Sequence, residues 1–258
     1  MRLKGKVALV TGASNRRSIG WGIAQALADE GADIVINDVA FPQELDARVA
    51  ELQAQGRRAL ACIADVSRPE QVQRMVTCAI DELGQIDILA SNAGIIRWEK
   101  FLDIQPQTLR DIVNVNLKGN IYLIRAVAQH MIERGQGGRI ILTSSVQSDM
   151  NFTVTPVYGA TKRAAHSLVG SLALELAPHN ITVNHIGPGW VRSPLNDSAP
   201  DQQNAADIEN QARNVPLHRA GTIEEMGRGV VYFASSDGDY TTGAFLRIDG
   251  GLGISKYS

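Results

Sequence analysis

Tyr158 and Lys162 are the pair of side chains in this 258-residue sequence with the clearest chemical use. Because they stand four residues apart, a helix would place them on one face, with the ammonium of Lys162 near the phenol of Tyr158. A free phenol has a pKa near 10, and proton transfer near neutrality needs a shift of roughly 3 units, which nearby positive charge can supply. The pair predicts a proton donor and acceptor, against the alternative of a surface Tyr–Lys contact.

A hydroxyl side chain, Ser145, stands 13 residues before Tyr158 and directly after the apolar run 139–144. A hydroxyl in such a position can hydrogen-bond a substrate oxygen as it changes between carbonyl and alkoxide-like character. The hydroxyl of Ser145 or that of its neighbour Ser144 could serve this purpose.

A glycine-rich segment, Thr11 to Gly22, follows the first apolar run and precedes a helix-forming stretch. Glycines in such a turn, here Gly12 and Gly20, let backbone amides approach a pyrophosphate at the helix N-terminus. Asp38 ends the next run, where an acidic side chain accepts hydrogen bonds from ribose hydroxyls and repels a 2′-phosphate. The segment predicts a dinucleotide site, against the alternative of an ordinary strand-to-helix turn.

Short apolar runs separated by helix-like spacers must position these residues. The runs are 7–11, 32–37, 59–64, 86–91, 139–144, 181–186 and 244–248. They lack strict alternation, which is typical of strands covered on both faces, and the spacers carry helical periodicity. We expect one α/β domain over 1–258, with a doubly wound, seven-stranded parallel sheet and helices on both faces. The polar segment 193–215 breaks the rhythm and is interpreted as a substrate lid.

The overall composition favours small molecules as partners. Twenty-five Lys and Arg against 27 Asp and Glu leave no basic surface for nucleic acid or an anionic membrane, and no apolar segment is long enough to span one. Two cysteines without a Cys-x-x-Cys pair, and five histidines without ligand spacing, indicate neither a disulfide framework nor a metal site. With no secretory signal pattern, we expect a cytoplasmic protein.

In these features the whole chain resembles the short-chain dehydrogenase/reductase family, which implies a Rossmann fold and an NAD(P)-dependent alcohol dehydrogenase or ketoreductase. The resemblance rests on Tyr-x-x-x-Lys and on the segments 64–66, 91–94, 114–119 and 184–193. The glycine loop departs from the usual TGxxxGxG pattern, because Ser18 replaces the middle glycine after two extra residues. It is similar to the loop of enoyl-acyl-carrier-protein reductases, but those relatives use Tyr-x6-Lys, and Thr155 stands where their tyrosine would be.

The resemblance implies a catalytic tetrad of Asn116, Ser145, Tyr158 and Lys162, in which Asn116 holds a water that connects Lys162 to solvent. It also implies that Asp65 and the Val66 backbone hold the adenine. The full set expected to bind the cofactor is Gly12, Ser14, Asn15, Arg17, Ser18, Ile19, Gly20, Asp38, Asp65, Val66, Asn92, Ala93, Gly94, Tyr158, Lys162, Pro188, Gly189, Val191 and Ser193.

Two features of the sequence disagree about which cofactor is used. Asp38 favours NAD, whereas Arg16 and Arg17 in the glycine loop could hold the 2′-phosphate of NADP. We expect NAD to be preferred, with NADP use still open.

The substrate is expected to meet a polar rim. The predicted substrate-binding residues are Ser145, Gln147, Asn151, Tyr158 and Trp190. Further polar side chains at the rim would be Arg97, Glu99 and Asp149. Such a rim suits a sugar, a polyol or another small polar alcohol, and the stretch 144–152 also resembles a segment of sugar 1-dehydrogenases.

Two alternatives stay open: an NADPH-dependent 3-oxoacyl-acyl-carrier-protein reductase, and a protein that senses nucleotides without turnover. His185 is expected to be structural, and the family resemblance implies a homotetramer.

Overall fold

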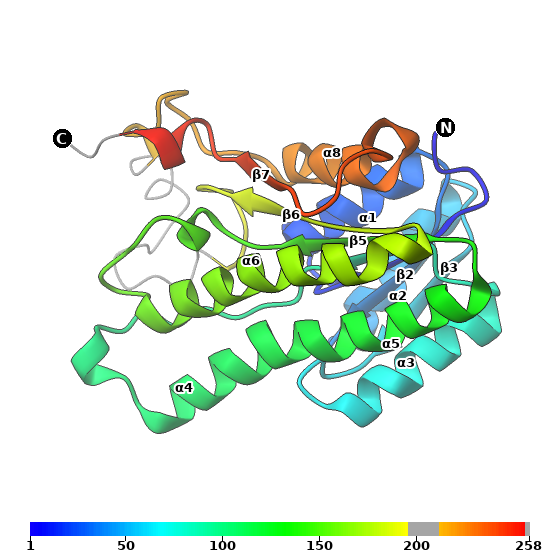
Figure 1. Ribbon diagram of the computed structural model, residues 1–258, viewed down its shortest axis with the longest axis horizontal. Coiled ribbons are helices and arrows are strands. Elements are labelled where there is room, and N and C mark those ends of the chain that lie inside the picture. The colour runs from blue at the N-terminus through cyan, green and yellow to red at the C-terminus, as the bar shows by residue number, and fades with distance from the viewer. Residues whose placement is uncertain (196–211, 256–258) are drawn as a thin grey trace.

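The computed structural model describes residues 1–195 and 212–255 of the chain. It shows one parallel sheet with helices on both faces (Figure 1). The strands are β1 (Val7–Thr11), β2 (Asp33–Asp38), β3 (Ala59–Ile63), β4 (Ile88–Ser91), β5 (Gly138–Thr143), β6 (Ile181–Pro188) and β7 (Phe245–Ile248). The helices are α1 (Ile19–Asp29), α2 (Pro42–Ala54), α3 (Pro69–Leu83), α4 (Pro106–Val113), α5 (Gly119–Arg134), α6 (Pro156–Leu176) and α8 (Ile223–Ala234).

The order of the strands in the sheet is β3-β2-β1-β4-β5-β6-β7, and all the pairs are parallel. The predicted doubly wound sheet is therefore confirmed, and every strand lies within two residues of its predicted run. The order reverses between β1 and β4, where the chain turns from one half of the sheet to the other. In sheets of this kind, ligands bind outside the carboxyl ends of the strands at this point.

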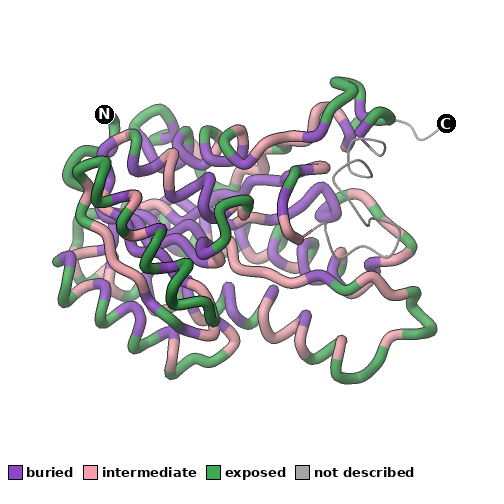
Figure 2. The backbone as a smooth tube through the Cα atoms, turned by 180° about the vertical axis from the view of Figure 1, so that it is seen from behind, coloured by how far each residue is buried: buried purple, intermediate pink, exposed green. Residues whose placement is uncertain are grey.

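Two apolar layers cover the sheet because alternate strand residues point to opposite faces. Val7 and Leu9 of β1 pack with α3, α5 and α6, whereas Ala8 and Val10 pack with α1, α2 and α8. The strands at the centre of the sheet are buried on both faces, and the tube is purple there (Figure 2). This explains why the strand sequences are apolar without a polar alternation.

The segment predicted as a lid, 193–215, lies mostly outside the described residues. Its first residues, Ser193, Pro194 and Leu195, border the central cavity. Within the described ranges, no helix has the length and apolar character needed to cross a membrane, and no cluster of His, Cys, Asp and Glu is suited to hold a metal ion.

Candidate active site

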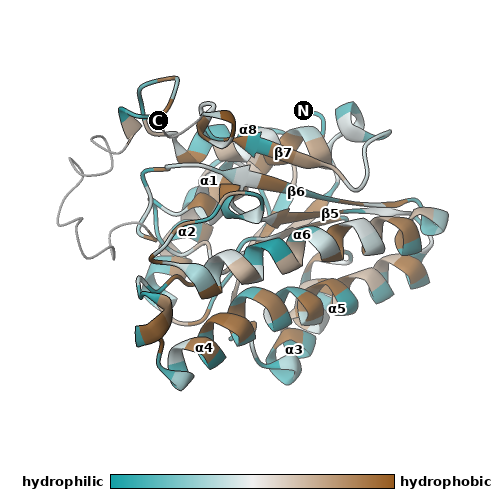
Figure 3. Ribbon diagram, turned by 60° about the vertical axis from the view of Figure 1, so that its left-hand side comes forward, coloured by the Kyte–Doolittle hydropathy of each residue, from teal (hydrophilic) through white to brown (hydrophobic). Residues whose placement is uncertain are grey.

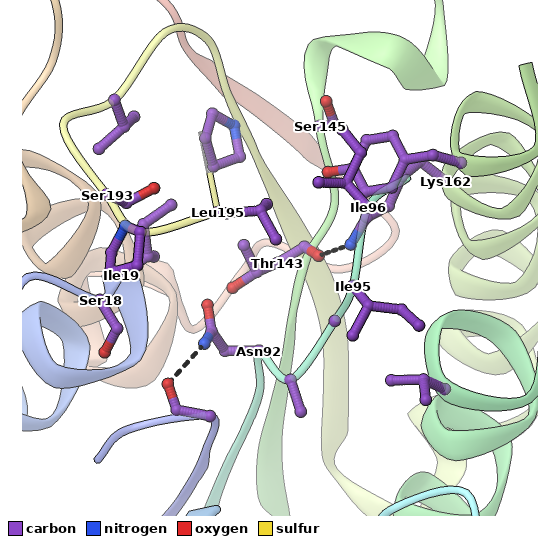
Figure 4. Close-up of a pocket in the computed structure, with 18 of the residues that line it drawn as sticks. Ser18, Ile19, Asn92, Ile95, Ile96, Thr143, Ser145, Lys162, Ser193 and Leu195 are labelled. Carbon is purple, nitrogen blue, oxygen red and sulfur yellow. Dashed lines mark hydrogen bonds between the residues drawn. The ribbon is translucent and has the colours of Figure 1, made fainter. Parts of the chain in front are cut away.

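The carboxyl ends of β1 to β6 open onto one cavity of about 490 Å³ (Figure 4). Each strand end contributes to the lining, because parallel strands finish at the same edge of the sheet. The predicted cofactor residues that line the cavity are Gly12, Asn15, Ser18, Ile19, Asp38, Asp65, Val66, Asn92, Ala93, Gly94, Tyr158, Lys162, Pro188, Gly189, Val191 and Ser193. Ser14, Arg17 and Gly20 are not in that lining.

The glycine loop is compact and joins β1 directly to the N-terminus of α1. Gly12 has a φ of 70°, which L side chains rarely adopt, and a Cβ on Gly20 would collide with the carbonyl oxygen of Gly12. The absence of a side chain at Gly20 is therefore needed for the close packing beneath the loop. Ser18 caps α1, since its Oγ accepts a hydrogen bond from the Trp21 amide at 3.0 Å.

The carboxylate of Asp38 lies at the end of β2, on the wall of the cavity. Its Oδ2 accepts hydrogen bonds from the Oγ and the amide of Ser14, at 2.6 and 3.2 Å, and its Oδ1 accepts one from the Val39 amide at 2.8 Å. Ser14 thus orients Asp38 from the glycine loop. This contact gives the predicted residue Ser14 a place in the site, although it does not line the cavity.

The turns after β3 and β4 build the middle of the cavity. Asp65 accepts a hydrogen bond from the Ser67 amide at 2.8 Å, which holds its carboxylate at the rim. Thr11 connects the turns after β1 and β4, because its Oγ1 accepts hydrogen bonds from the amides of Asn92 and Ala93, each at 3.0 Å. The sequence analysis did not single out Thr11, whose hydroxyl is fully buried at the end of β1.

Tyr158, Lys162 and Ser145 meet at the opposite end of the cavity. Tyr158 and Lys162 lie in the first two turns of α6, and the Nζ of Lys162 is 5.4 Å from the centre of the Tyr158 ring. The same Nζ donates a hydrogen bond to the carbonyl oxygen of Thr143 at 2.9 Å (Figure 4). Ser145 follows β5 and is the hydrogen-bond partner of the Tyr158 phenol.

Asn116 lies behind this group, in a π-helical turn (Asn114–Lys118) between α4 and α5. It is fully buried and is not part of the cavity lining. Its amide side chain accepts from the Ile95 amide and donates to the Ile95 carbonyl, both at 2.9 Å. Asn116 thereby fixes the segment that follows Gly94, and π-helical turns of this kind often occur at functional sites.

Burial shifts the pKa values of Tyr158 and Lys162 in opposite directions, because it disfavours the charged form of each group and the two charges have opposite signs. Burial raises the pKa of Tyr158 to about 12, and the hydrogen bond with Ser145 only partly opposes this. Burial lowers the pKa of Lys162 to about 8. The phenol is therefore protonated at neutral pH, and the lysine does not by itself produce the downward shift that the sequence analysis required.

The predicted polar rim is largely absent from the described lining. Gln147 and Trp190 line the cavity, whereas Asn151 is exposed and is not part of the lining, so its contact with a substrate stays a prediction. Asp149 turns away to pair with Arg247 of β7, and Glu99 accepts a hydrogen bond from Thr108. The lining also holds apolar and aromatic side chains, which the expectation of a polar rim did not include: Ile96, Trp98, Val146, Phe152, Leu195 and Leu252.

His185 has no place in this site. It is buried in β6, its Nε2 lies 3.2 Å from the Nδ1 of His166, and its ring stacks on Phe245. Burial, reinforced by His166, lowers the pKa of His185 to about 4. The neutral, packed ring agrees with the expectation of a structural histidine.

Comparison with known proteins shows to which family this chain belongs. The sequence profile described as "Enoyl-(Acyl carrier protein) reductase" matches residues 12–253. An L-rhamnose 1-dehydrogenase (NAD(P)(+)) of a Sphingomonas species is 36% identical over 254 residues, which cover 98% of both chains. The chain belongs to the short-chain dehydrogenase/reductase family.

Other members of the short-chain dehydrogenase/reductase family agree in sequence and structure. A 2-dehydro-3-deoxy-D-gluconate 5-dehydrogenase of Escherichia coli is 35% identical over 250 residues, covering 96% of each chain. A gluconate 5-dehydrogenase from Burkholderia cenocepacia, solved in complex with NADP and tartrate, superposes with a TM-score of 0.91 at 33% identity, covering 99% of this chain and 98% of that one. The protein is therefore an oxidoreductase of the short-chain family that uses a nicotinamide cofactor, NAD or NADP.

Proposed function

We propose that the protein moves a hydride between the nicotinamide C4 of NAD(P) and the carbinol carbon of a small polar secondary alcohol or hemiacetal, most simply a sugar or polyol. The observation that supports this is the meeting of Tyr158, Ser145 and Lys162 at one end of the cavity whose other end holds the glycine loop and Asp38. A substrate oxygen beside Tyr158 and a dinucleotide extended toward Asp38 would share this cavity.

The residues present fit a dinucleotide. Gly12 and Gly20 let the glycine loop pack closely against Asn92 and Ala93. This packing positions the N-terminus of α1, where a pyrophosphate would meet the backbone amides. Asp38 would accept hydrogen bonds from the adenosine ribose, and Asp65 and Val66 would border the adenine. The carboxamide of the nicotinamide would be held by Pro188, Gly189, Val191 and Ser193. The bound nicotinamide supplies the hydride acceptor or donor and, when oxidised, a positive charge.

In the proposed reaction Tyr158 carries the proton. In oxidation its phenolate takes the hydroxyl proton of the substrate, and in reduction its phenol returns a proton to the carbonyl oxygen. The Ser145 hydroxyl donates a hydrogen bond to the same oxygen and stabilises it as charge develops. Lys162, held by the Thr143 carbonyl, stabilises the phenolate through its ammonium. Asn116 fixes the Gly94–Ile96 segment and, as the family resemblance implies, would hold a water that exchanges protons with Lys162.

NAD is the cofactor we propose to be preferred. Ser14 holds the Asp38 carboxylate in place through its hydroxyl and amide, and a fixed negative charge there repels a 2′-phosphate. The loop arginine Arg16, which could offset that repulsion, pairs with Glu51 of α2 at 2.7 Å. This pairing also weakens the case for an NADPH-dependent 3-oxoacyl-acyl-carrier-protein reductase.

The substrate class rests on the reacting end of the cavity. Gln147, buried and held by the Thr155 hydroxyl at 2.9 Å, joins Ser145 and Tyr158 as a polar group beside the reacting oxygen. The apolar wall of Trp98, Phe152 and Trp190 limits the size of the substrate and can pack against the apolar face of a sugar ring. The sugar and sugar-acid dehydrogenases among the relatives give independent support.

Initial rates test the proposal directly. NAD and NADP reduction are measured with aldoses, polyols and simple secondary alcohols, and NADH and NADPH oxidation are measured with an acetoacetyl thioester. Y158F, which removes only the phenolic oxygen, serves as the blank. Turnover of a sugar or polyol with NAD that Y158F lacks supports the proposal. Preferred reduction of the thioester with NADPH contradicts both the substrate class and the cofactor preference.

We also propose that the protein is a homotetramer in the cytoplasm. An apolar groove of about 270 Å³ between α4 and α6 supports association, because large exposed apolar surfaces on a monomer usually mark interfaces. It is continuous with Phe101, which is 72% exposed, and the neighbouring Leu102 is 94% exposed. Figure 3 shows hydrophobic segments of α4 on the outside of the molecule.

A further inference from the structure

An ion-pair cluster outside the reacting end of the cavity connects the glycine loop to α2. The guanidinium of Arg16 contacts Oε1 of Glu51 through its Nε at 3.2 Å and through a terminal nitrogen at 2.7 Å. The same Oε1 also pairs with Arg48, one turn earlier in α2. One carboxylate therefore holds two arginines, one from the loop and one from the helix.

The two arginines differ in how firmly they are held. Arg48 is buried, and its guanidinium lies 5.3 Å from the centre of the Trp21 ring, a cation–π contact that fixes it between α1 and α2. The side chain of Arg16 is 66% exposed. Glu51 is thus anchored to the body of the protein by Arg48, whereas Arg16 is a long, solvent-facing side chain that Glu51 retains.

The cluster lies next to the adenosine end of the cavity. Asn15, the residue before Arg16, lines the cavity together with Asp38 and Val39 at the end of β2. A 2′-phosphate bound at this end would carry a charge of about −2 and would lie close to the Asp38 carboxylate. A nearby cation would be needed to offset the repulsion. An arginine suits this role because its planar fork can bind a phosphate with two hydrogen bonds.

We infer that Glu51 is a specificity-determining residue, which holds Arg16 against α2 and away from a 2′-phosphate and so favours NAD over NADP. The inference rests on the proposed use of a nicotinamide dinucleotide in this cavity. The chain carries an arginine that can serve NADP, and the ion pair with Glu51 competes with the phosphate for it. Glu51 acts through Arg16 and contacts neither the substrate nor the reacting atoms.

Binding titrations followed by the fluorescence of the reduced nicotinamide test this without turnover. NADH and NADPH are titrated against the wild-type protein, E51Q, R16Q and the double variant R16Q/E51Q. The matched control is D46N, which removes one negative charge from an exposed position of the same helix. We expect E51Q to bind NADPH about tenfold more tightly, the scale of one charge-assisted contact, with the NADH affinity unchanged.

The double variant distinguishes release of Arg16 from a general loss of negative charge. We expect R16Q alone to change NADPH binding little and to abolish the gain in the E51Q background, a non-additive result that reports coupling between the two residues. A gain that persists in R16Q/E51Q, or a D46N gain equal to that of E51Q, overturns the inference.

Different results would overturn the cofactor assignment and the role of Glu51. A wild-type protein that binds neither NADH nor NADPH overturns both, whereas an E51Q protein that binds NADH normally and gains no NADPH affinity overturns the role of Glu51 alone. NADH binding also reports that each variant is folded. If E51Q loses NADH binding because Arg48 is left unpaired, E51D keeps a carboxylate beside Arg48 while shortening the reach to Arg16, and the same gain for NADPH is expected.

Discussion

At the residue scale, Tyr158 and Lys162 are both buried, and burial keeps the first protonated and makes the second easier to deprotonate. A pKa of about 12 for the Tyr158 phenol suits a proton donor for carbonyl reduction at neutral pH. Alcohol oxidation needs the phenolate, which becomes accessible only if positive charge offsets the cost of burial. The ammonium of Lys162 and an oxidised nicotinamide are the two cations that the proposed complex would offer.

Replacement of Lys162 tests this electrostatic role. We expect kcat/KM for alcohol oxidation to rise with pH from neutrality, because the fraction of phenolate rises, and to stop rising above about pH 8, where Lys162 loses its ammonium. In K162Q the rise moves to higher pH, and the rate at pH 8 falls by about 10²–10⁴-fold. The measurement is a pH–rate profile of wild type and K162Q, with K118Q as a control at an exposed lysine. A K162Q profile that superimposes on the wild type contradicts the role.

Sequence reasoning singled out many residues that line the cavity, but not the direction of every side chain. Tyr158 and Lys162 meet because a helix fixes the spacing of residues four apart. Asp149 was expected at the rim, but it pairs with Arg247, which lies 98 residues later in the chain. Arg16 is likewise held by Glu51 from another element. Contacts between side chains on separate elements leave no local pattern, so a single sequence cannot reveal them.

At the scale of elements, the site depends on the close approach of α1 to α8. Gly22 of α1 and Gly227 of α8 face each other, and a Cβ on either would collide with backbone of the opposite helix. This contact holds the N-terminal turn of α1, and with it the glycine loop, against the body of the protein. The sequence analysis did not assign a role to either glycine, because the crossing of two distant helices has no signature in one sequence.

The glycine pair gives a stability prediction with an internal control. G227A should lower the free energy of unfolding by about 2–3 kcal/mol, because the added methyl meets backbone that cannot move away cheaply. A Cβ at Gly170 in α6 would have no atom within 4 Å. G170A should therefore raise the free energy of unfolding by about 0.5–1 kcal/mol, because alanine favours the helix more than glycine does. Urea denaturation of both variants checks the pair. A G227A protein as stable as G170A would contradict the tight crossing.

The packing of β6 against α6 and β7 predicts an acid-sensitive component of stability. Burial and the neighbouring His166 lower the pKa of His185 to about 4, with Asp149 and the Ala244 carbonyl opposing the shift. The unfolded chain therefore binds a proton between about pH 6.5 and pH 4 that the folded protein does not, so stability falls as the pH falls through this window. The loss attributable to His185 is about 3 kcal/mol.

Replacing His185 by a side chain that does not titrate isolates this component. We expect H185Q to be less stable than wild type at pH 7, because the stacking on Phe245 is lost, yet to lose about 3 kcal/mol less between pH 6.5 and pH 4. The free energy of unfolding is measured across this range, with H179Q as a control at an exposed histidine. Parallel pH curves for H185Q and wild type would show that His185 does not carry the effect.

At the scale of the whole molecule, the doubly wound parallel sheet followed from the alternation of short apolar runs with helical spacers. Parallel strands require crossovers, and right-handed crossovers leave few topologies for seven strands. What this reasoning could not supply is association, because an interface is built from exposed residues that carry no periodic signal of their own. The groove between α4 and α6 became visible only when residues 101–117 and 156–164 were placed side by side.

That groove leads to the prediction for the oligomer. A tetramer with dihedral symmetry uses at least two distinct isologous interfaces, so disrupting one of them should leave dimers held by the other. Leu109 lines the groove and is 46% exposed, so L109E introduces a charge at the apolar contact without emptying the core of the chain. We expect wild type to sediment at four times the chain mass of 27.8 kDa and L109E at half that value. I63E, at an exposed position on the edge strand β3, should remain tetrameric. A wild-type protein that sediments as a monomer, or an L109E protein that remains a tetramer, would show that this face does not join the subunits.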